Sequence, residues 1–200
     1  MSPPAKPGAR RGPYAKGLAR RTEILQAALT AYGAADNQQQ PSLKQIADSL
    51  GMTEAGVLHY FDSKDHLLVS VLESRDEVAR KTFDLTTWDG IYAAIRRTYE
   101  TPGEVKLFVD MVVAAADPNH PAHAFLTGRD TALRDLLRLV LGQGGDEDDW
   151  QPRILVAAID GLQLRWLRDP RIDILADMQR LVEALAPGRS AAASNPDQEV

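Results

Sequence analysis

The sequence predicts an all-α protein of about nine helices, with an N-terminal head of three helices followed by a larger helical domain. Apolar side chains recur at three- and four-residue spacing through most of the chain, as they do on the buried face of an α-helix. Proline, glycine and capping residues stand between these segments, where helices are expected to begin or end. No useful length of alternating apolar and polar residues, the pattern of a half-buried strand, interrupts them.

Two short helices joined at a glycine form the centre of the predicted head. Ser42 and Gln45 have the spacing of a capping box and precede a short apolar stripe, so a helix is expected over residues 42–50. Gly51 stands where a helix can end in the left-handed conformation. Thr53 is placed to cap the next helix, which therefore starts only two residues after the first one stops.

Such a short turn forces the two helix axes to cross, so that the second helix can enter a DNA major groove. We expect Val57 and Leu58 to face the first helix. The outward side chains offer hydroxyl and imidazole groups for phosphates or bases, and very small residues let the helix approach base edges. The predicted DNA-contacting residues are Ser42, Leu43, Thr53, Glu54, Ala55, Gly56, His59, Tyr60 and Lys64.

Lys64 and Glu54 carry opposite charges on this predicted surface. Lys64 lies in the first turn of the following helix, where exposed backbone N–H groups already favour a phosphate. Glu54 has two interpretations: it accepts a hydrogen bond from a cytosine amine, or it complements the dipole of its own helix.

A further helix over residues 18–32 is expected to support this pair, which completes a head at residues 17–62. Residues 1–16 are rich in proline, glycine and basic side chains, and we expect a disordered arm there. The arm is basic although the whole chain has a net charge of −5. It can follow DNA phosphates or enter a minor groove, and a solubilising tail is the alternative.

The second domain is expected at residues 63–186, before a disordered tail at residues 187–200. Thr101, Pro102 and Glu104 form a strong helix start, with a threonine cap, proline at the first helical position and glutamate at the third. An acidic, glycine-rich loop is expected at residues 142–149. The helices predicted here span residues 63–85, 88–100, 101–117, 121–141, 152–168 and 171–186.

Residues 18–72 resemble the DNA-binding domain of TetR-family transcriptional regulators of the TetR/AcrR type. The resemblance is most specific in the pairs Ile46-Ala47 and Leu50-Gly51, in Thr53, and in the run His59-Tyr60-Phe61-Asp62-Ser63-Lys64 before Leu67-Leu68. The chain departs from the family pattern in three places: a longer linker with three glutamines at residues 33–42, a leucine at position 58 where tyrosine is common, and an acidic residue at position 54.

The resemblance implies a homodimeric repressor that a small-molecule effector releases from its double-stranded DNA operator. It also implies that the last two helices pair with their copies. Ala157, Ala158 and Gly161 would permit such close helix packing, and burial within one subunit is the alternative. An activator of the same fold, or a helical small-molecule-binding protein without DNA affinity, remains as another interpretation.

An effector pocket is expected among the aromatic residues of the second domain, although aromatic side chains at helical spacing also form ordinary cores. The predicted pocket residues are Trp88, Tyr92, Phe108, Met111, Phe125, Gln163 and Trp166.

Several other classes of protein find no support in the sequence. Asp117, His120 and His123 form an incomplete ligand set, so no metal or other cofactor is expected. No nucleophile, phosphate-binding glycine loop or spaced carboxylate pair indicates an enzyme. The absence of cysteine, of a secretory signal and of a long apolar span favours a cytoplasmic protein without a membrane partner.

Overall fold

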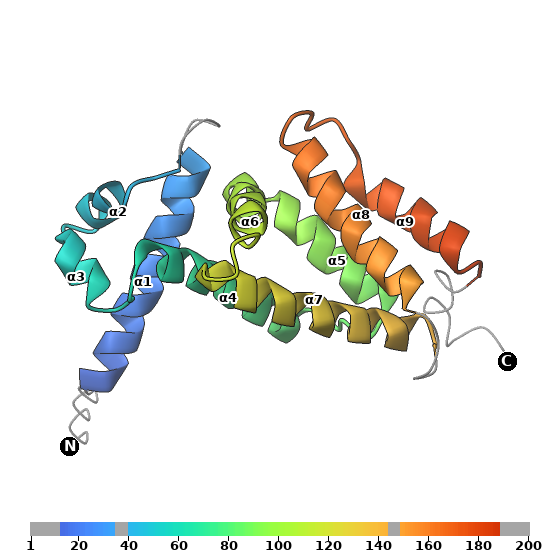
Figure 1. The fold of residues 1–200 in the computed structure, drawn as a ribbon, viewed down its shortest axis with the longest axis horizontal. Helices are drawn as coiled ribbons and strands as arrows, with labels where there is room; N and C mark the ends of the chain where they lie inside the picture. Colours follow the sequence, from blue (N-terminus) through green and yellow to red (C-terminus); the bar gives the residue numbers. More distant parts are fainter. Residues whose placement is uncertain (1–12, 35–39, 144–148, 189–200) are drawn as a thin grey trace, which may run out of the picture.

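The computed structural model describes residues 13–34, 40–143 and 149–188, and each regular element in these ranges is an α-helix. This agrees with the all-α prediction. Figure 1 shows an elongated molecule with α2 and α3 at one end and the pair α8 and α9 at the other. In the described ranges the helices are α1 (Pro13–Ala34), α2 (Leu43–Ser49), α3 (Glu54–Leu58), α4 (Lys64–Thr82), α5 (Trp88–Tyr99), α6 (Pro102–Ala114), α7 (Pro121–Val140), α8 (Trp150–Trp166) and α9 (Ile174–Leu185).

The head is built on a core that continues into α6. Ile24 of α1, Ile46 of α2 and Val57 of α3 are fully buried, and they belong to the same cluster as Phe108 and Met111 of α6. The head therefore does not have a core of its own: it shares one with α6 and with Ala122 at the start of α7 (Figure 1).

Close backbone packing fixes α1 against the start of α6. A Cβ atom added at Gly103 would lie 2.7 Å from the backbone nitrogen of Gly33 and 2.9 Å from its Cα. Real Cβ atoms do not approach a backbone so closely, so a side chain at position 103 would push the two helices apart.

The body has a second core between α5, α7, α8 and α9. Trp88 and Tyr92 of α5 meet Leu155 of α8 and Met178 and Val182 of α9 there. The long helix α4 starts in the head and continues beside α7 in the body (Figure 1). It is therefore a rigid connection between the two halves of the molecule.

Several helix boundaries differ from the predicted ones. Helix α1 already begins at Pro13, so residues 13–16, assigned to the arm, are helical. Helix α9 begins at Ile174, where the Asp173 carboxylate accepts a hydrogen bond from the Ala176 amide. The hydroxyl of Thr101 does not cap α6 as predicted, because it accepts a hydrogen bond from Arg97 instead.

The turn between α4 and α5 explains why α4 stops at Thr82, three residues before the predicted end. Asp84 accepts hydrogen bonds from the amide and hydroxyl of Thr86, and the Thr87 hydroxyl caps α5 by accepting from the Gly90 amide. A Cβ atom at Gly90 would lie 1.9 Å from the Asp84 carbonyl oxygen, so this tight turn requires glycine.

The predicted arm up to residue 12, residues 144–148 of the acidic, glycine-rich loop and the tail from residue 189 lie outside the described residues. Within the described ranges, the helices are too short or too polar to span a membrane.

Candidate nucleic-acid interface and internal cavity

The helix-turn-helix forms as its capping residues predict. Ser42 caps α2 through a complete capping box with Gln45, and the Thr53 hydroxyl caps α3 by accepting from the Gly56 amide at 3.0 Å. Gly51 between the helices has a φ of 62°, the left-handed conformation that glycine adopts without strain. These local interactions fix the crossing of α2 and α3.

One side of α3 is exposed, and it is not quite the side that was predicted. Glu54, Ala55, Leu58 and His59 face solvent together, whereas Val57 is fully buried. The prediction that Leu58 packs against the preceding helix is wrong, because its side chain is 41% exposed. The outer face thus carries one acidic group, two apolar groups and one imidazole.

Gly56 does not belong to this outer face. A Cβ atom there would lie 3.3 Å from the Thr53 hydroxyl and 3.4 Å from the Met52 side chain, so Gly56 faces the turn between α2 and α3. The absence of a side chain at Gly56 therefore serves this local packing.

The remaining predicted contact residues surround α3. Ser42 and Thr53 are exposed at the starts of α2 and α3. Leu43 and Tyr60 are half-buried and pack against the core of the head. The His59 ring meets the Tyr60 ring edge to face, with 5.4 Å between the ring centres, so Tyr60 also supports an exposed residue of the outer face.

Lys64 links the head to the body. It is the first residue of α4, and its ammonium donates a hydrogen bond to Gln40 Oε1 at 3.4 Å. Gln40 also lies near Asp110 of α6. Burial raises the pKa of Asp110, and the charge of Lys106 and the side chain of Gln40 oppose this rise. The candidate phosphate-binding end of α4 is therefore connected to α6 through the glutamine-containing linker.

A second contact at the start of α4 lies next to Lys64 in the chain. Asp65 of α4 is 3.4 Å from Nε2 of His120, whose Nδ1 accepts a hydrogen bond from the Ala122 amide at the start of α7. His123 instead bonds the carbonyl of Ala115. The two histidines thus serve helix ends, and the described residues contain no cluster of ligands for a metal ion.

Two arginines next to the predicted arm have structural roles that the sequence did not reveal. Arg20 donates to the carbonyl of Leu50, at the end of α2, at 3.2 Å. Arg21 donates to the Ser70 hydroxyl at 3.0 Å and stacks on Phe61, with its guanidinium carbon 4.6 Å from the ring centre. Arg20 thus holds α1 against α2, and Arg21 holds it against α4 and the turn before α4.

A cavity of about 970 Å³ lies in the body, with walls from α4, α5, α7, α8 and α9. Four of the seven predicted pocket residues line it: Trp88, Tyr92, Phe125 and Gln163. The other three do not.

Phe108 and Met111 are buried in the core shared by the head and α6, because they lie on the side of α6 that faces α1 and α4. Trp166 lines a separate surface hollow of about 470 Å³ near the start of α9, where its ring lies 5.2 Å from that of Tyr99. Tyr99 lines both spaces, so its ring stands between the hollow and the cavity.

Buried uncharged polar groups line the cavity among apolar side chains. The Trp88 indole nitrogen, the hydroxyls of Tyr92 and Tyr99 and Oε1 of Gln163 have no hydrogen-bond partner among the described residues. Burial raises the pKa of Tyr92 to about 12, and burial together with Asp160 raises that of Tyr99, so both hydroxyls stay protonated at neutral pH. These groups are available to a bound molecule.

Charged residues close the end of the cavity next to α6. Both carboxylate oxygens of Asp76 are bonded: Oδ1 accepts from Arg75 at 2.8 and 3.0 Å, and Oδ2 accepts from Arg129 at 2.9 Å. Both guanidinium groups also lie over the Phe108 ring, at 5.3 and 4.9 Å from its centre. No local pattern in the sequence predicts this group of residues, because its members come from three helices far apart in the chain.

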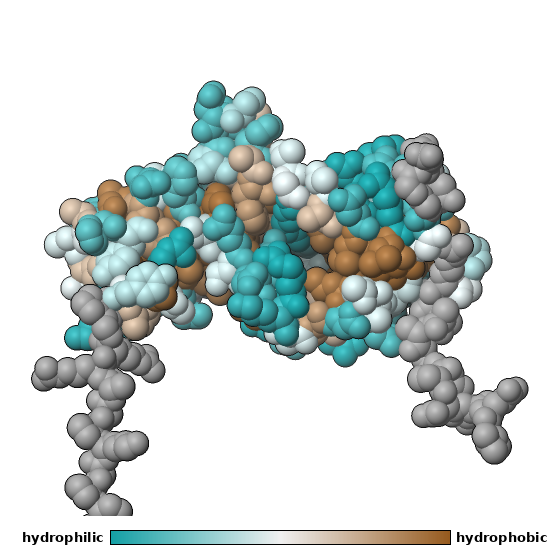
Figure 2. Space-filling view, turned by 90° about the horizontal axis from the view of Figure 1, so that it is seen from below, coloured by the Kyte–Doolittle hydropathy of each residue, from teal (hydrophilic) through white to brown (hydrophobic). Residues whose placement is uncertain are grey.

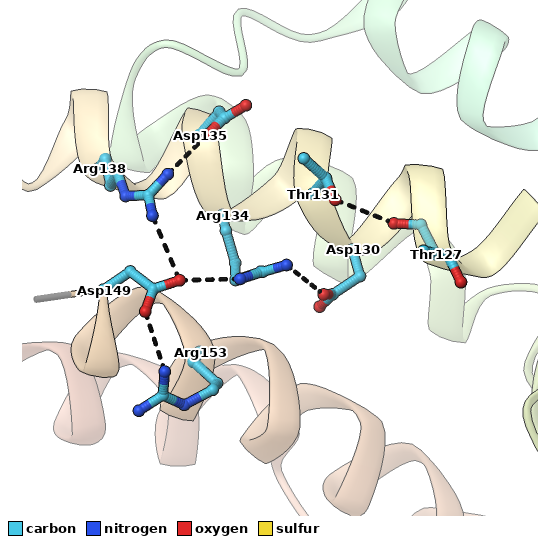
Figure 3. Close-up of polar contacts among 8 residues, drawn as sticks. All are labelled: Thr127, Asp130, Thr131, Arg134, Asp135, Arg138, Asp149 and Arg153. Atoms are coloured by element: carbon cyan, nitrogen blue, oxygen red, sulfur yellow. Dashed lines mark hydrogen bonds and ion pairs between the residues drawn. The ribbon is translucent and has the colours of Figure 1, made fainter. Parts of the chain in front are cut away.

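A second ionic network fixes the start of α8 to α7 (Figure 3). Asp149 accepts from Arg134 at 2.8 Å and Arg153 at 2.9 Å and lies 3.2 Å from Arg138. The hydrogen bond from Arg134 and the nearby guanidinium charges hold the pKa of Asp149 below its usual value. Asp149 is therefore ionised at neutral pH and orients α8.

The surface of the body exposes apolar side chains. Figure 2 shows apolar surface between hydrophilic regions on the body half of the molecule. On α8, Trp150, Ile154 and Leu164 are 42%, 43% and 49% exposed, in line with the exposed small residues Ala157 and Gly161. This stripe follows a four- and three-residue alternation, as in helices that pack along a seam.

The sequence of the helix-turn-helix matches a known family. Residues 40–71, which include α2, α3 and the first part of α4, match the family model of bacterial regulatory proteins of the tetR family. No curated protein sequence matches the chain.

Solved structures of transcriptional regulators share the fold over most of the chain. A TetR transcriptional regulator from Rhodococcus sp. RHA1 is 21% identical, with a TM-score of 0.61 over 84% of this chain and 96% of the regulator. NalD of Pseudomonas aeruginosa, the secondary repressor of the MexAB-OprM multidrug efflux pump, is 21% identical, with a TM-score of 0.57 over 84% and 95%. The fatty acid degradation regulator FadR of Bacillus halodurans is 15% identical, with a TM-score of 0.59 over 90% and 98%.

The likeness in fold extends through the helical body, although sequence identity is low. The helix-turn-helix of this chain is thus similar in sequence to bacterial regulatory proteins of the tetR family, and the chain as a whole shares the fold of solved transcriptional regulators.

Proposed function

We propose that the chain is a homodimeric repressor that binds a DNA operator through its two heads and leaves it when a small-molecule effector enters the cavity. The observation that carries this proposal is that α4 contributes to both sites. Its first residue, Lys64, stands beside the DNA-reading helix, and Arg75, Asp76 and Ala79 line the cavity. A molecule that displaces α4 in the body must therefore also displace the end of α4 in the head.

The cavity has the size and the chemistry of a small-molecule site. About 970 Å³ is at the upper end of the usual range, and the walls combine apolar side chains with a few buried polar groups. An effector that binds one arrangement of the heads better than the other would weaken operator binding through a coupling of about 1–3 kcal/mol. NalD, a repressor of similar fold, is consistent with this role.

The exposed stripe on α8 supports a dimer. Apolar side chains at this level of exposure favour burial against a second copy, and a two-fold axis would bring the small residues Ala157 and Gly161 of both copies together at the centre. The stripe lies at the end of the molecule opposite α3, so two heads would project from one dimer to paired half-sites (Figure 1).

The first prediction is that the purified protein retards DNA fragments from its own genomic neighbourhood in a mobility-shift assay. Because phosphate contacts release counterions, its affinity should fall about 10³-fold or more as salt rises from 50 to 200 mM if each dimer makes at least six such contacts. A folded dimer that binds none of these fragments at low salt would contradict the proposal. It would favour a helical small-molecule-binding protein, an alternative that the exposed carboxylate of Glu54 on the outer face supports.

The second prediction is that Gly161→Leu turns the dimer into a monomer without unfolding it. No atom lies within 4 Å of a Cβ placed at Gly161, so leucine fits the subunit but would separate two α8 helices that pack closely. Light scattering coupled to size-exclusion chromatography measures the mass. Gly17→Leu in α1 is the matched control, since Gly17 is also helical with open space around it. A Gly161→Leu protein that remains dimeric would place the interface elsewhere.

A further inference from the structure

Leu58 has an unusual position for an apolar side chain. It is the last residue of α3, it is 41% exposed, and it lies one helical turn from Ala55 on the outer face. The other apolar residue at this end of α3, Val57, is fully buried, so the exposure of Leu58 follows from its place on the helix and not from a loosely packed head.

Among the described residues, neither hydrophobic core includes this side chain. Leu58 does not belong to the core of the head or to the hydrophobic residues that pack against it. The stripe on α8 is at the opposite end of the molecule, so the proposed dimer would not cover it either (Figure 1). The surface that faces α3 in the proposed function is the major groove of the operator.

Only one group in the major groove matches the chemistry of Leu58 and Ala55. Base edges there offer hydrogen-bond donors and acceptors, which an aliphatic side chain cannot use, and the 5-methyl group of thymine, which it can contact. A leucine also cannot bind a phosphate, so a role in general affinity is excluded for it.

We propose that Leu58 is a specificity-determining residue that, together with Ala55, contacts thymine methyl groups in the operator. The inference rests on the proposed DNA binding and adds to it the kind of base that α3 selects. Glu54, one residue before Ala55, gives the same face an acceptor that suits the amine of a neighbouring cytosine or adenine.

The test combines a change in the protein with a change in the DNA. A site is first selected from random double-stranded DNA with the wild-type protein, and each thymine of the half-site is then replaced by uracil, which removes only the methyl group. The wild-type protein should lose about fourfold in affinity for at least one replacement in each half-site, the value expected for one buried methyl group. The Leu58→Ala protein should bind the thymine and uracil forms equally at the thymine that Leu58 contacts, and any discrimination that remains at another thymine is expected from Ala55.

Val78→Ala is the matched control, because Val78 is an exposed apolar residue of α4 in the body, with 55% exposure. It should discriminate between thymine and uracil as the wild type does. Sites selected without thymine in the half-sites, or equal discrimination by the wild-type and Leu58→Ala proteins, would overturn the inference and leave the proposed function intact. A folded dimer that selects no DNA at all would instead refute the proposed function.

Discussion

Replacing Asp76 by asparagine should lower the free energy of unfolding by about 3 kcal/mol, because it removes the carboxylate that forms ion pairs with two largely buried arginines. Arg75 and Arg129 donate three hydrogen bonds to Asp76, and the Phe108 ring beneath them cannot take over these bonds. The amide of asparagine accepts fewer of them and carries no charge. Urea denaturation followed by circular dichroism measures the loss.

The neighbouring residue provides a matched control. Glu77 also binds two basic side chains, Arg80 at 2.8 Å and Lys81 at 2.9 Å, but all three side chains are well exposed. These two partners lower the pKa of Glu77 to about 2. Glu77→Gln should nevertheless leave the midpoint of denaturation nearly unchanged, because water screens exposed pairs. Equal losses for Asp76→Asn and Glu77→Gln would show that burial does not strengthen the Asp76 network.

The sequence predicts those parts of the fold that depend on local interactions. The capping box of Ser42 and Gln45, the left-handed Gly51 and the cap at Thr53 act within a few residues, and the structure confirms each of them. The side on which Leu58 lies depends instead on how steeply α3 crosses α2. Because α3 has only five residues, its apolar pattern is too short to define a buried face.

The residues that line the cavity could likewise be predicted from the sequence only in part. Residue type indicated that aromatic side chains would gather in the body, and Trp88, Tyr92 and Phe125 do line the cavity. Whether an aromatic residue faces a cavity or a core depends on how its helix is rotated against its neighbours. Helix α6 turns Phe108 and Met111 toward α1 and α4, and no spacing within α6 specifies that rotation.

Replacing Gln163 by leucine should change stability and effector binding in opposite directions. Oε1 of Gln163 is buried and has no partner among the described residues, a cost to the folded state that leucine removes. The free energy of unfolding should therefore rise by about 1 kcal/mol. Compounds that raise the unfolding temperature of the wild-type protein serve as effector candidates. Those that donate a hydrogen bond to Gln163 should bind the variant about tenfold more weakly, as the loss of one such bond predicts.

Gln151 on the same helix separates this effect from a general response of α8 to the loss of an amide. Its Nε2 donates to the carbonyl of Leu185 in α9 at 3.2 Å, so Gln151→Leu should lower the free energy of unfolding by about 1 kcal/mol and leave effector binding unchanged. Both glutamines are at least half-buried, but only Gln151 serves the packing of α8 on α9, and only Gln163 lines the cavity. A Gln163→Leu protein that is less stable than the wild type would mean that Gln163 supports the fold. Unchanged affinity for every candidate compound would mean that the effector does not bind Gln163. A gain in stability together with a loss of affinity is the result expected if Gln163 serves ligand binding at a cost in stability.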